Sequence, residues 1–302
     1  MPRQTGKAAD VRPPDSIIAL IEQTLGQAVL SVEPVGGGCI ANASRVESGG
    51  GTYFLKWAAG TAGETFVAEG EGLVALASHD SRLLVPKPIS MRNADEAGPG
   101  LLLMEWIEED VKSKTFWENL GRGLAELHRA RSGETYGFET DNFIGRLPQR
   151  NRLHADWAEF FTNERILPQA EMARLSGRWS LAWDHGLNRL LNRLPSLLPA
   201  RPNASLVHGD LWTGNVLASR GGRAAVVDPA IYRGHREVDL AMSELFGGFS
   251  SAFLEAYNSE WKVDSGYRDR RDVYNLYHLI NHLNHFGSSY AGQVTSVLRR
   301  FA

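Results

Sequence analysis

The chain lacks the features that mark secreted, membrane-spanning or nucleic-acid-binding proteins. Its 302 residues include one cysteine, Cys39, which excludes an intrachain disulfide framework. No stretch approaches the roughly 20 apolar residues of a membrane-spanning helix, and the expected flexible tail at 1–15 lacks the apolar core of a secretory signal. A formal net charge of −3 gives no electrostatic case for nucleic acid or anionic membrane. We therefore expect a cytoplasmic protein, monomeric or homodimeric, that binds neither of them.

Predicted strands dominate the first third of the chain. Apolar and β-branched runs predict strands at 29–35, 42–47, 52–57 and 101–107. Ser48-Gly49-Gly50-Gly51 predicts a hairpin between two of these strands. Helical spacing of apolar residues predicts helices at 16–25, capped by Asp15 or Ser16, and at 66–78. We expect a small antiparallel sheet with one inserted helix.

The remainder of the chain is predicted to be mainly helical. Apolar periodicity predicts helices at 115–129, 157–174, 181–194, 250–259 and 268–286. Short apolar runs between 206 and 228 are the exception and predict hairpins. The composition changes at about 105–110. We therefore predict an α+β chain with a sheet-containing N-lobe at 16–106 and a helical C-lobe at 107–302.

The most specific pattern lies in the stretch LVHGDLWTGNVLASRGGRAAVVD at 206–228. Asp210 and Asn215 stand in a loop in the order D-x-x-x-x-N, and Asp228 follows the third apolar run. This spacing is typical of a phosphotransferase: Asp210 would accept or orient the proton of an acceptor hydroxyl. Asn215 and Asp228 would supply the oxygen ligands that Mg²⁺ prefers. We expect His208 to brace the loop through hydrogen bonds rather than to transfer a proton.

The segment after Asp228 lacks two features of a regulated protein kinase. Pro229 and Ala230 stand where D-F-G would have its phenylalanine and glycine, and no A-P-E segment follows. Pro229 fixes φ and removes a backbone donor, and no phenylalanine is present to change position between active and inactive states. The pattern therefore favours a kinase of small molecules over a protein kinase controlled by an activation loop.

Three glycines in the first lobe are candidates for binding the phosphates of ATP. Gly36, Gly37 and Gly38 would let backbone N–H groups approach phosphate oxygens without obstruction by a Cβ. Ala41 stands where G-x-G-x-x-G would have its third glycine, so a plain turn explains these residues equally well. Cys39 beside them is either a small buried side chain or a thiol whose oxidation would impair nucleotide binding.

Lys56 ends a predicted strand and is the candidate for binding the α- and β-phosphates. A solvated lysine is the commoner outcome, but a carboxylate on the next helix could orient it. Spacing alone does not decide whether Glu69 or Glu71 would be the carboxylate that pairs with Lys56. Backbone groups of Glu105 and Ile107, at the lobe junction, could hydrogen-bond an adenine edge, although a strand that merely connects the lobes would look the same.

The chain resembles the fructosamine kinases (ketosamine 3-kinases), which belong to the aminoglycoside-phosphotransferase-like group with a protein-kinase-like fold. V-H-G-D-L-W-T-G-N-V at 207–216 resembles their catalytic loop. Further similar blocks are P-V-G-G-G-C-I at 34–40, F-V-A-E-G at 66–70, V-P-K-P-I at 85–89, L-L-M-E-W at 102–106, D-N-F-I-G-R-L-P-Q-R-N at 141–151, W-A-E-F-F at 157–161, Y-R-G-H-R-E-V-D-L-A-M at 232–242 and N-H-L-N-H-F-G at 281–287. The resemblance implies the bilobal protein-kinase-like fold for the two lobes.

The resemblance also implies an activity and its cofactors. Fructosamine kinases use ATP and Mg²⁺ to phosphorylate the sugar 3-hydroxyl of ketosamines (fructosamines and ribulosamines), the adducts of amines with reducing sugars. The 3-phosphate then eliminates spontaneously and frees the amine, so the reaction is a deglycation repair. By the same resemblance Asp210 is the base, Asn215 and Asp228 bind Mg²⁺, Lys56 binds phosphate, and Glu69 rather than Glu71 is the lysine's partner.

Four further residues receive roles from the resemblance. Trp212, between Asp210 and Asn215, would stack against the sugar-amine, and His282 would make a polar contact to the same ligand. A packing role explains either residue equally well. Glu237 and Asp239 would brace the catalytic loop rather than touch the substrate.

Two other functions remain open from the sequence. The chain could be another small-molecule kinase of this fold, with an aminoglycoside or choline-like acceptor. It could also be a catalytically silent nucleotide-binding regulator, although the intact set of Lys56, Asp210, Asn215 and Asp228 argues against silence. The preferred sugar and amine, and whether the ketosamine is free or protein-bound, are not predicted.

Overall fold

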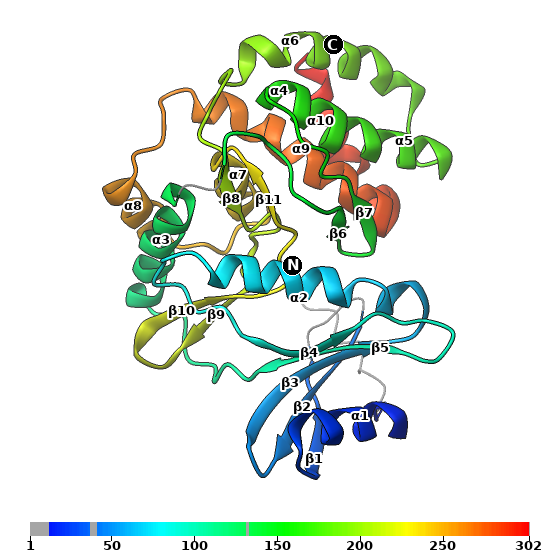
Figure 1. The fold of residues 1–302 in the computed structure, drawn as a ribbon. Helices are drawn as coiled ribbons and strands as arrows, with labels where there is room; N and C mark the ends of the chain where they lie inside the picture. The colour runs from blue at the N-terminus through cyan, green and yellow to red at the C-terminus, as the bar shows by residue number, and fades with distance from the viewer. Residues whose placement is uncertain (1–11, 37–40, 131–132, 302) are drawn as a thin grey trace.

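The computed structural model describes residues 12–36, 41–130 and 133–301. Figure 1 shows a lobe built around one sheet and, above it in that view, a lobe built mainly of helices. Helix α2 (Phe66–Ala77) lies along the side of the sheet that faces the helical lobe. Across the described residues, no helix is both long enough and apolar enough to cross a membrane.

The first lobe contains a five-stranded antiparallel sheet in the order β1-β2-β3-β5-β4. Its strands are β1 (Val29–Pro34), β2 (Asn42–Ser48), β3 (Gly51–Ala58), β4 (Pro88–Arg92) and β5 (Gly100–Glu105). The predicted hairpin at 48–51 is present, since Ser48 pairs with Gly51. Strand β4 was not predicted, since Pro86 and Pro88 are residues that usually interrupt a strand. It is an edge strand, where a proline costs little of the hydrogen-bond ladder.

A helix covers each face of this sheet. Successive strand residues point to opposite faces, so in β5 Leu101 and Leu103 join a cluster with α1 (Asp15–Leu25), while Leu102 and Met104 join the cluster under α2. The expected cap of α1 is wrong. Pro14 occupies the N-cap position without a side-chain hydrogen bond, and Asp15 lies within the first turn, where its charge complements the helix dipole.

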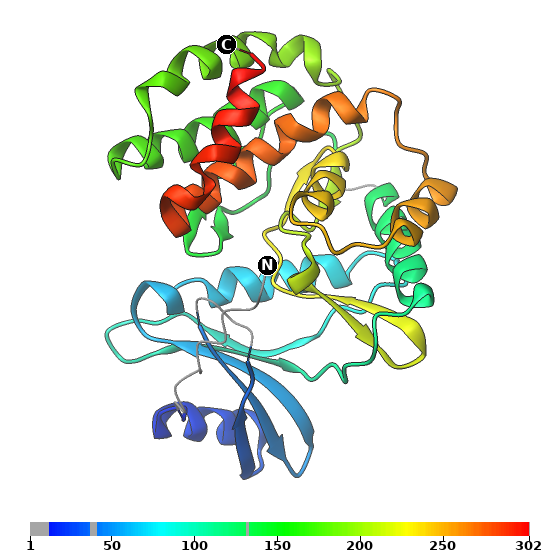
Figure 2. The same cartoon turned by 180° about the vertical axis from the view of Figure 1, so that it is seen from behind.

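Helices of the second lobe agree with the predicted ranges to within a few residues. They are α3 (Lys114–Arg129), α4 (Trp157–Phe160), α5 (Leu167–Leu175), α6 (Asp184–Leu197), α8 (Ser251–Glu260) and α9 (Tyr267–Phe286). A π-helical stretch at Phe161–Ile166 joins α4 to α5. Two helices were missed, α7 (Glu237–Leu245) and α10 (Ala291–Arg299), and Figure 2 shows α10 crossing α9. Helix α7 is buried from Glu237 through Ser243, so it carries no amphipathic pattern.

Short strands of the second lobe frame the predicted catalytic loop. Strand β8 (Ser205–Val207) precedes it, and the hairpin of β9 (Val216–Ser219) and β10 (Arg223–Val226) follows, as predicted. Strand β11 (Tyr232–Gly234) returns antiparallel to β8. A second hairpin, β6 (Asn142–Ile144) with β7 (Leu147–Gln149), was not predicted. The end of β8 and the end of β10 lie close together, since Nε2 of His208 lies 2.9 Å from the carbonyl oxygen of Val227.

Candidate active site

The loop after β8 carries Asp210, and a glycine lets the chain enter it. Gly209 has a φ of 82°, and a Cβ at this position would overlap the carbonyl oxygen of Ala230. Only glycine meets both conditions. The Asp210 side chain follows directly and is partly buried. A short 3₁₀ turn, Thr213–Asn215, then leads into β9.

Asp239 on α7 holds this loop from within the core. Its carboxylate accepts the backbone N–H groups of His208 at 2.7 Å and Gly209 at 2.9 Å, and it lies 3.0 Å from Nε2 of His128. Burial alone would raise the pKa of Asp239, but the hydrogen bond and charge of His128 outweigh it, so the pKa is lowered. Asp239 therefore braces the loop as an anion. The same expectation for Glu237 is wrong, because Glu237 pairs with Arg270 at 2.7 Å instead.

His208 braces the same loop, as predicted. The Asp210 N–H donates to its Nδ1 at 3.3 Å, and its Nε2 lies 2.9 Å from the carbonyl oxygen of Val227. Because Nδ1 accepts, Nε2 carries the proton that is donated to Val227. Burial lowers the pKa of His208, which favours this neutral form. The imidazole thus ties the catalytic loop to the end of β10.

Asn215 joins Asp210 to Asp228. Its Nδ2 donates to the Asp210 carbonyl oxygen at 2.9 Å, to Asp210 Oδ2 at 3.1 Å and to the Asp228 carbonyl oxygen at 3.4 Å. The structure therefore brings the three predicted residues together. Since Nδ2 serves these acceptors, the carbonyl oxygen Oδ1 is the atom of Asn215 left to bind a cation.

Asp228 adopts an unusual backbone conformation. It is the one described residue other than glycine with a positive φ, 56°. This left-handed region costs an L-residue on the order of 1 kcal/mol, and residues held there cluster at functional sites. Its carboxylate and Asn215 Oδ1 form an all-oxygen donor pair that fits Mg²⁺, which usually takes one or two protein ligands together with substrate phosphates and water. No group of three or more His, Cys, Asp or Glu side chains in the described part of the chain could hold a metal by itself.

Lys56 projects from β3 toward two carboxylates. Its Nζ lies 2.8 Å from Glu69 Oε1, and it also pairs with Asp228. Burial lowers the pKa of Lys56, but the charges of Asp228 and Glu69 outweigh it, and the net shift is upward. The Lys56–Glu69 pair predicted from the resemblance is thus present, whereas Glu71 is exposed.

Electrostatics make Asp210 a stronger base than an ordinary aspartate. Burial and the neighbouring charge of Asp228 raise the pKa of Asp210 to about 7, against the hydrogen bond from Asn215. A proton acceptor is most effective when its pKa lies near the working pH. Glu69 shows a similar shift, since burial raises its pKa to about 7 despite Lys56.

Helix α2 packs closely on the segment after Asp228. A Cβ built on Gly72 would lie 3.2 Å from Cγ of Pro229 and 3.6 Å from the side chain of Ile231. A larger residue would push α2, and Glu69 with it, away from this segment. Gly72 and the buried side chains Asn142, Gln149 and His128 were not predicted to serve the site. No sequence signal links His128 to Asp239, because their contact spans 111 positions.

The structure describes only some of the other residues predicted to bind the nucleotide. Gly36 is described and a Cβ there would have open space around it, whereas Gly37, Gly38 and Cys39 lie outside the described residues. Glu105 ends β5, and its backbone N–H donates to the Lys87 carbonyl oxygen at 3.0 Å. That N–H is therefore in use within the lobe. Ile107 follows in the connection between the lobes.

Trp212 and His282 lie in different surroundings. Trp212 is 37% exposed, and its ring covers Gly214 so closely that a Cβ there would overlap it. His282 contacts the rings of Phe246 at 4.8 Å, Tyr290 at 5.0 Å and Phe286 at 5.5 Å between centroids. We call these four rings the aromatic cluster.

The aromatic cluster and the catalytic loop are connected through a turn. Thr213 packs on Gly248, two residues after Phe246, where a Cβ would lie only 2.7 Å from Thr213 Cγ2. Within the cluster, Nδ1 of His282 lies 2.8 Å from the His278 carbonyl oxygen. Burial lowers the pKa of His282 to about 4, so the ring is neutral at physiological pH.

Comparison with known proteins gives consistent matches along the chain. The family model described as fructosamine kinase matches residues 14–302. A probable ketoamine kinase of Synechocystis sp. is 38% identical over 292 residues, 95% of this chain and 96% of that protein. A protein-ribulosamine 3-kinase of Arabidopsis thaliana, named as chloroplastic, is 35% identical over 272 residues, 89% of this chain and 82% of that protein.

Solved structures agree with these matches. A putative fructosamine-3-kinase of Thermobifida fusca has a TM-score of 0.83 at 31% identity, covering 95% of this chain and 98% of that one. An aminoglycoside phosphotransferase solved with AMP-PNP and hygromycin B has a TM-score of 0.67 over 94% of this chain and 98% of that one. At 14% identity the latter shows the fold alone. The predicted α+β, bilobal, protein-kinase-like fold is confirmed.

Proposed function

The chain belongs to the fructosamine kinase family and is an ATP-dependent kinase of ketosamines, and we propose that it phosphorylates the sugar 3-hydroxyl beside Asp210. The observation that carries this proposal is the assembly of Asp210, Asn215 and Asp228 with the Lys56–Glu69 pair. Spontaneous loss of the 3-phosphate would then free the amine, which makes deglycation repair the proposed biological outcome.

Asp210 is the proposed base. Its carboxylate would take the proton of the 3-hydroxyl while that oxygen forms a bond to the γ-phosphorus and the bond from the γ-phosphorus to the β,γ-bridging oxygen breaks, leaving ADP. A pKa of about 7 suits this transfer near neutral pH. Mg²⁺, bound by Asp228 and Asn215 Oδ1, would neutralise charge on the phosphates.

The first lobe is proposed to hold the nucleotide. Lys56, oriented by Glu69, would contact the α- and β-phosphates. The glycines Gly36, Gly37 and Gly38 would cover the phosphates with backbone N–H groups. For adenine we propose the Glu105 carbonyl oxygen and the Ile107 backbone, because the Glu105 N–H already donates to Lys87.

Trp212 and His282 are the proposed acceptor-binding residues. The exposed part of the Trp212 ring would stack on the sugar-amine, and neutral His282 could accept a hydrogen bond at Nε2 because its Nδ1 is used by the His278 carbonyl. A neutral imidazole would also not repel the ammonium of a ketosamine, which is positively charged near pH 7. The flat rings beside it, Phe246 and Phe286, offer surface to the amine part.

The lobe limits and the compartment are also proposals. We assign 16–106 to the nucleotide-binding lobe and 107–302 to the catalytic lobe, supported by the end of β5 at Glu105. The single cysteine supports a reducing compartment such as the cytoplasm, although one relative is named as chloroplastic. A monomer and a homodimer both stay compatible with this function.

An acceptor panel tests the function. The purified protein with ATP and Mg²⁺ is given fructoselysine, ribuloselysine, a set of aminoglycosides, choline, or no acceptor, and phosphate transfer is measured. We expect transfer to the ketosamines alone, at the 3-position by NMR of the product. Transfer only to an aminoglycoside or to choline would assign a different acceptor class. Nucleotide binding without any transfer would indicate a silent regulator.

A further inference from the structure

Two buried amide side chains outside the proposed reacting centre hold the segment that follows Asp228. Gln149, at the end of β7, donates from Nε2 to the carbonyl oxygen of Ala230 at 3.0 Å. Asn142, at the start of β6, donates from Nδ2 to the carbonyl oxygen of Ile231 at 2.8 Å. Their exposed fractions are 2% and 7%, so water does not compete for these hydrogen bonds. We call Gln149 and Asn142 the amide pair.

A hydrogen-bond network fixes the orientation of the amide pair. Carbonyl oxygens can only accept, so both NH₂ groups must face the segment. The second hydrogen of Gln149 Nε2 goes to Asn142 Oδ1 at 2.8 Å, and Gln149 Oε1 accepts from the Tyr277 hydroxyl at 2.6 Å. Neither amide can turn over without placing its own oxygen against a backbone carbonyl oxygen, which would leave buried acceptors without a donor and is costly.

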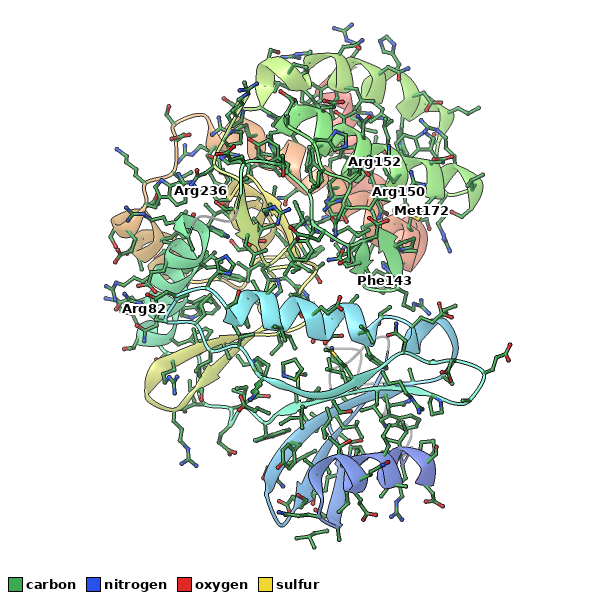
Figure 3. The ribbon with its side chains drawn as sticks, viewed as in Figure 1. Arg82, Phe143, Arg150, Arg152, Met172 and Arg236 are labelled. Carbon is green, nitrogen blue, oxygen red and sulfur yellow. The ribbon has the colours of Figure 1, made fainter. Side chains whose placement is uncertain are left out.

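The same segment is held on its other sides by the catalytic loop and by α2. The Ala230 N–H donates to the His208 carbonyl oxygen at 2.8 Å, and Gly72 of α2 lies against Pro229. The hairpin that carries the amide pair also packs on α2 through β6. Figure 3 shows Phe143 of this hairpin on the side toward α2. One hairpin thus touches both the helix that carries Glu69 and the segment that follows Asp228.

We propose that the amide pair are positioning residues that hold Asp228 and α2 in the arrangement phosphoryl transfer needs, without an activation step. Protein kinases order the segment after their metal-binding aspartate by phosphorylation of a long loop. Here three residues, Pro229–Ile231, separate Asp228 from β11, and they are buried. Hydrogen bonds from Gln149 and Asn142 replace the modification. The inference rests on the proposed function for the role of Asp228.

Gln149→Ala tests the proposal, with Gln169→Ala as its matched control. Gln169 is also 2% exposed, but its amide oxygen meets Asn284, on α9. We expect backbone hydrogen–deuterium exchange in the peptide 227–232 to accelerate about tenfold or more in Gln149→Ala. Turnover should fall roughly 10- to 100-fold in this variant because the metal-binding carboxylate is misplaced. In Gln169→Ala both quantities should stay within about twofold of the wild type.

Two more conservative variants test the proposal if Gln149→Ala does not fold. Tyr277→Phe removes only the hydroxyl that orients Gln149, and Tyr274→Phe removes a hydroxyl on the same helix that serves His235. We expect faster exchange at 227–232 and a two- to fivefold loss of turnover, roughly, in Tyr277→Phe alone. Equal exchange and equal turnover in the two variants would overturn the proposal. Hydrogen–deuterium exchange is measured without a ketosamine, so it tests the amide pair independently of the acceptor. A wild-type protein that phosphorylates no ketosamine would refute the proposed function without bearing on the exchange result.

Discussion

The phosphate side and the acceptor side of the candidate site are built in different ways. On the phosphate side, buried groups hold the backbone next to Asp210 and Asp228: Asp239 accepts from the N–H groups of His208 and Gly209, and His208 bonds to the carbonyl oxygen of Val227. On the acceptor side Trp212, Phe246 and Phe286 present exposed ring surface. Hydrogen bonds are directional, whereas ring contacts tolerate different shapes. The comparison suggests that the transferred phosphoryl group, which never varies, meets a fixed frame, and that the variable amine meets an adaptable surface.

The largest effect is expected on the phosphate side, from Asp210→Asn. The amide cannot take the hydroxyl proton, so turnover should fall by about 10³-fold or more. ATP does not contact this side chain in the proposed arrangement, so the Kd of ATP should stay within about twofold. Steady-state kinetics and nucleotide titration check both. Turnover comparable to wild type would show that proton transfer happens elsewhere.

A smaller loss is expected when the frame, rather than the base, is altered. Asp239→Asn leaves one carbonyl oxygen for the two N–H groups of His208 and Gly209, so turnover should fall roughly 10- to 100-fold and the free energy of unfolding by about 1–3 kcal/mol. Glu237→Gln is the control, since Glu237 is equally buried on α7 but pairs with Arg270. Both variants should be less stable by urea unfolding. If they lose turnover equally, Asp239 has no special role in the frame.

On the acceptor side we expect losses in substrate affinity instead. Trp212→Ala removes the stacking surface and should raise the KM of the ketosamine about tenfold with little change in the KM of ATP. Trp212→Phe keeps a ring and should recover most of that loss. The measurement is a pair of KM values for each variant. If Trp212→Ala instead loses turnover at saturating ketosamine, and Trp212→Phe does not recover it, then Trp212 supports the loop rather than binding the acceptor.

A last effect concerns the stability of the fold in acid rather than turnover, and it should arise from a buried histidine. His278 is buried, and burial, with His282 and Arg165, lowers its pKa to about 3 against the charge of Asp239. The unfolded chain takes up the proton near pH 6.5, so the contribution of His278 to stability is complete above that pH and is lost as the pH falls from 6.5 toward 3. Between pH 8 and pH 5 the titration of His278 should therefore lower the free energy of unfolding by an amount on the order of 2 kcal/mol.

Urea unfolding at the two pH values checks this prediction. His278→Gln, which does not titrate in this range, should show a smaller difference between pH 8 and pH 5 than the wild type. His185→Gln replaces an exposed histidine on α6 and serves as the control. An unchanged pH difference in His278→Gln would contradict the assignment of the acid sensitivity to this buried ring.

Features set by local pattern could be predicted from the sequence. Most of the longer strands and helices follow from the period of their apolar residues, and the β2–β3 hairpin follows from its glycines. Asp210, Asn215 and Asp228 were grouped correctly because the short segments between them allow few arrangements. Glu69 required the resemblance, since Glu71 stands on the same predicted helix.

Features that depend on distant contacts could not be predicted. Helix α7 has no polar face that would reveal its period. The contact of His128 with Asp239 and the bonds of Asn142 and Gln149 to Ile231 and Ala230 join positions far apart in the chain. A buried asparagine or glutamine looks the same in the sequence as a surface one. The frame of the site is therefore visible only once the chain is folded.

The left-handed backbone of Asp228 has an evolutionary consequence. Glycine would adopt this conformation without the steric cost that aspartate bears, so the backbone conformation at 228 favours glycine, while the proposed metal binding and the ion pair with Lys56 require the carboxylate. Backbone preference and catalysis therefore favour different residues at this one position. A descendant released from its enzymatic duty would be free to replace this aspartate early, and the residue at 228 would record whether a lineage still depends on the reaction.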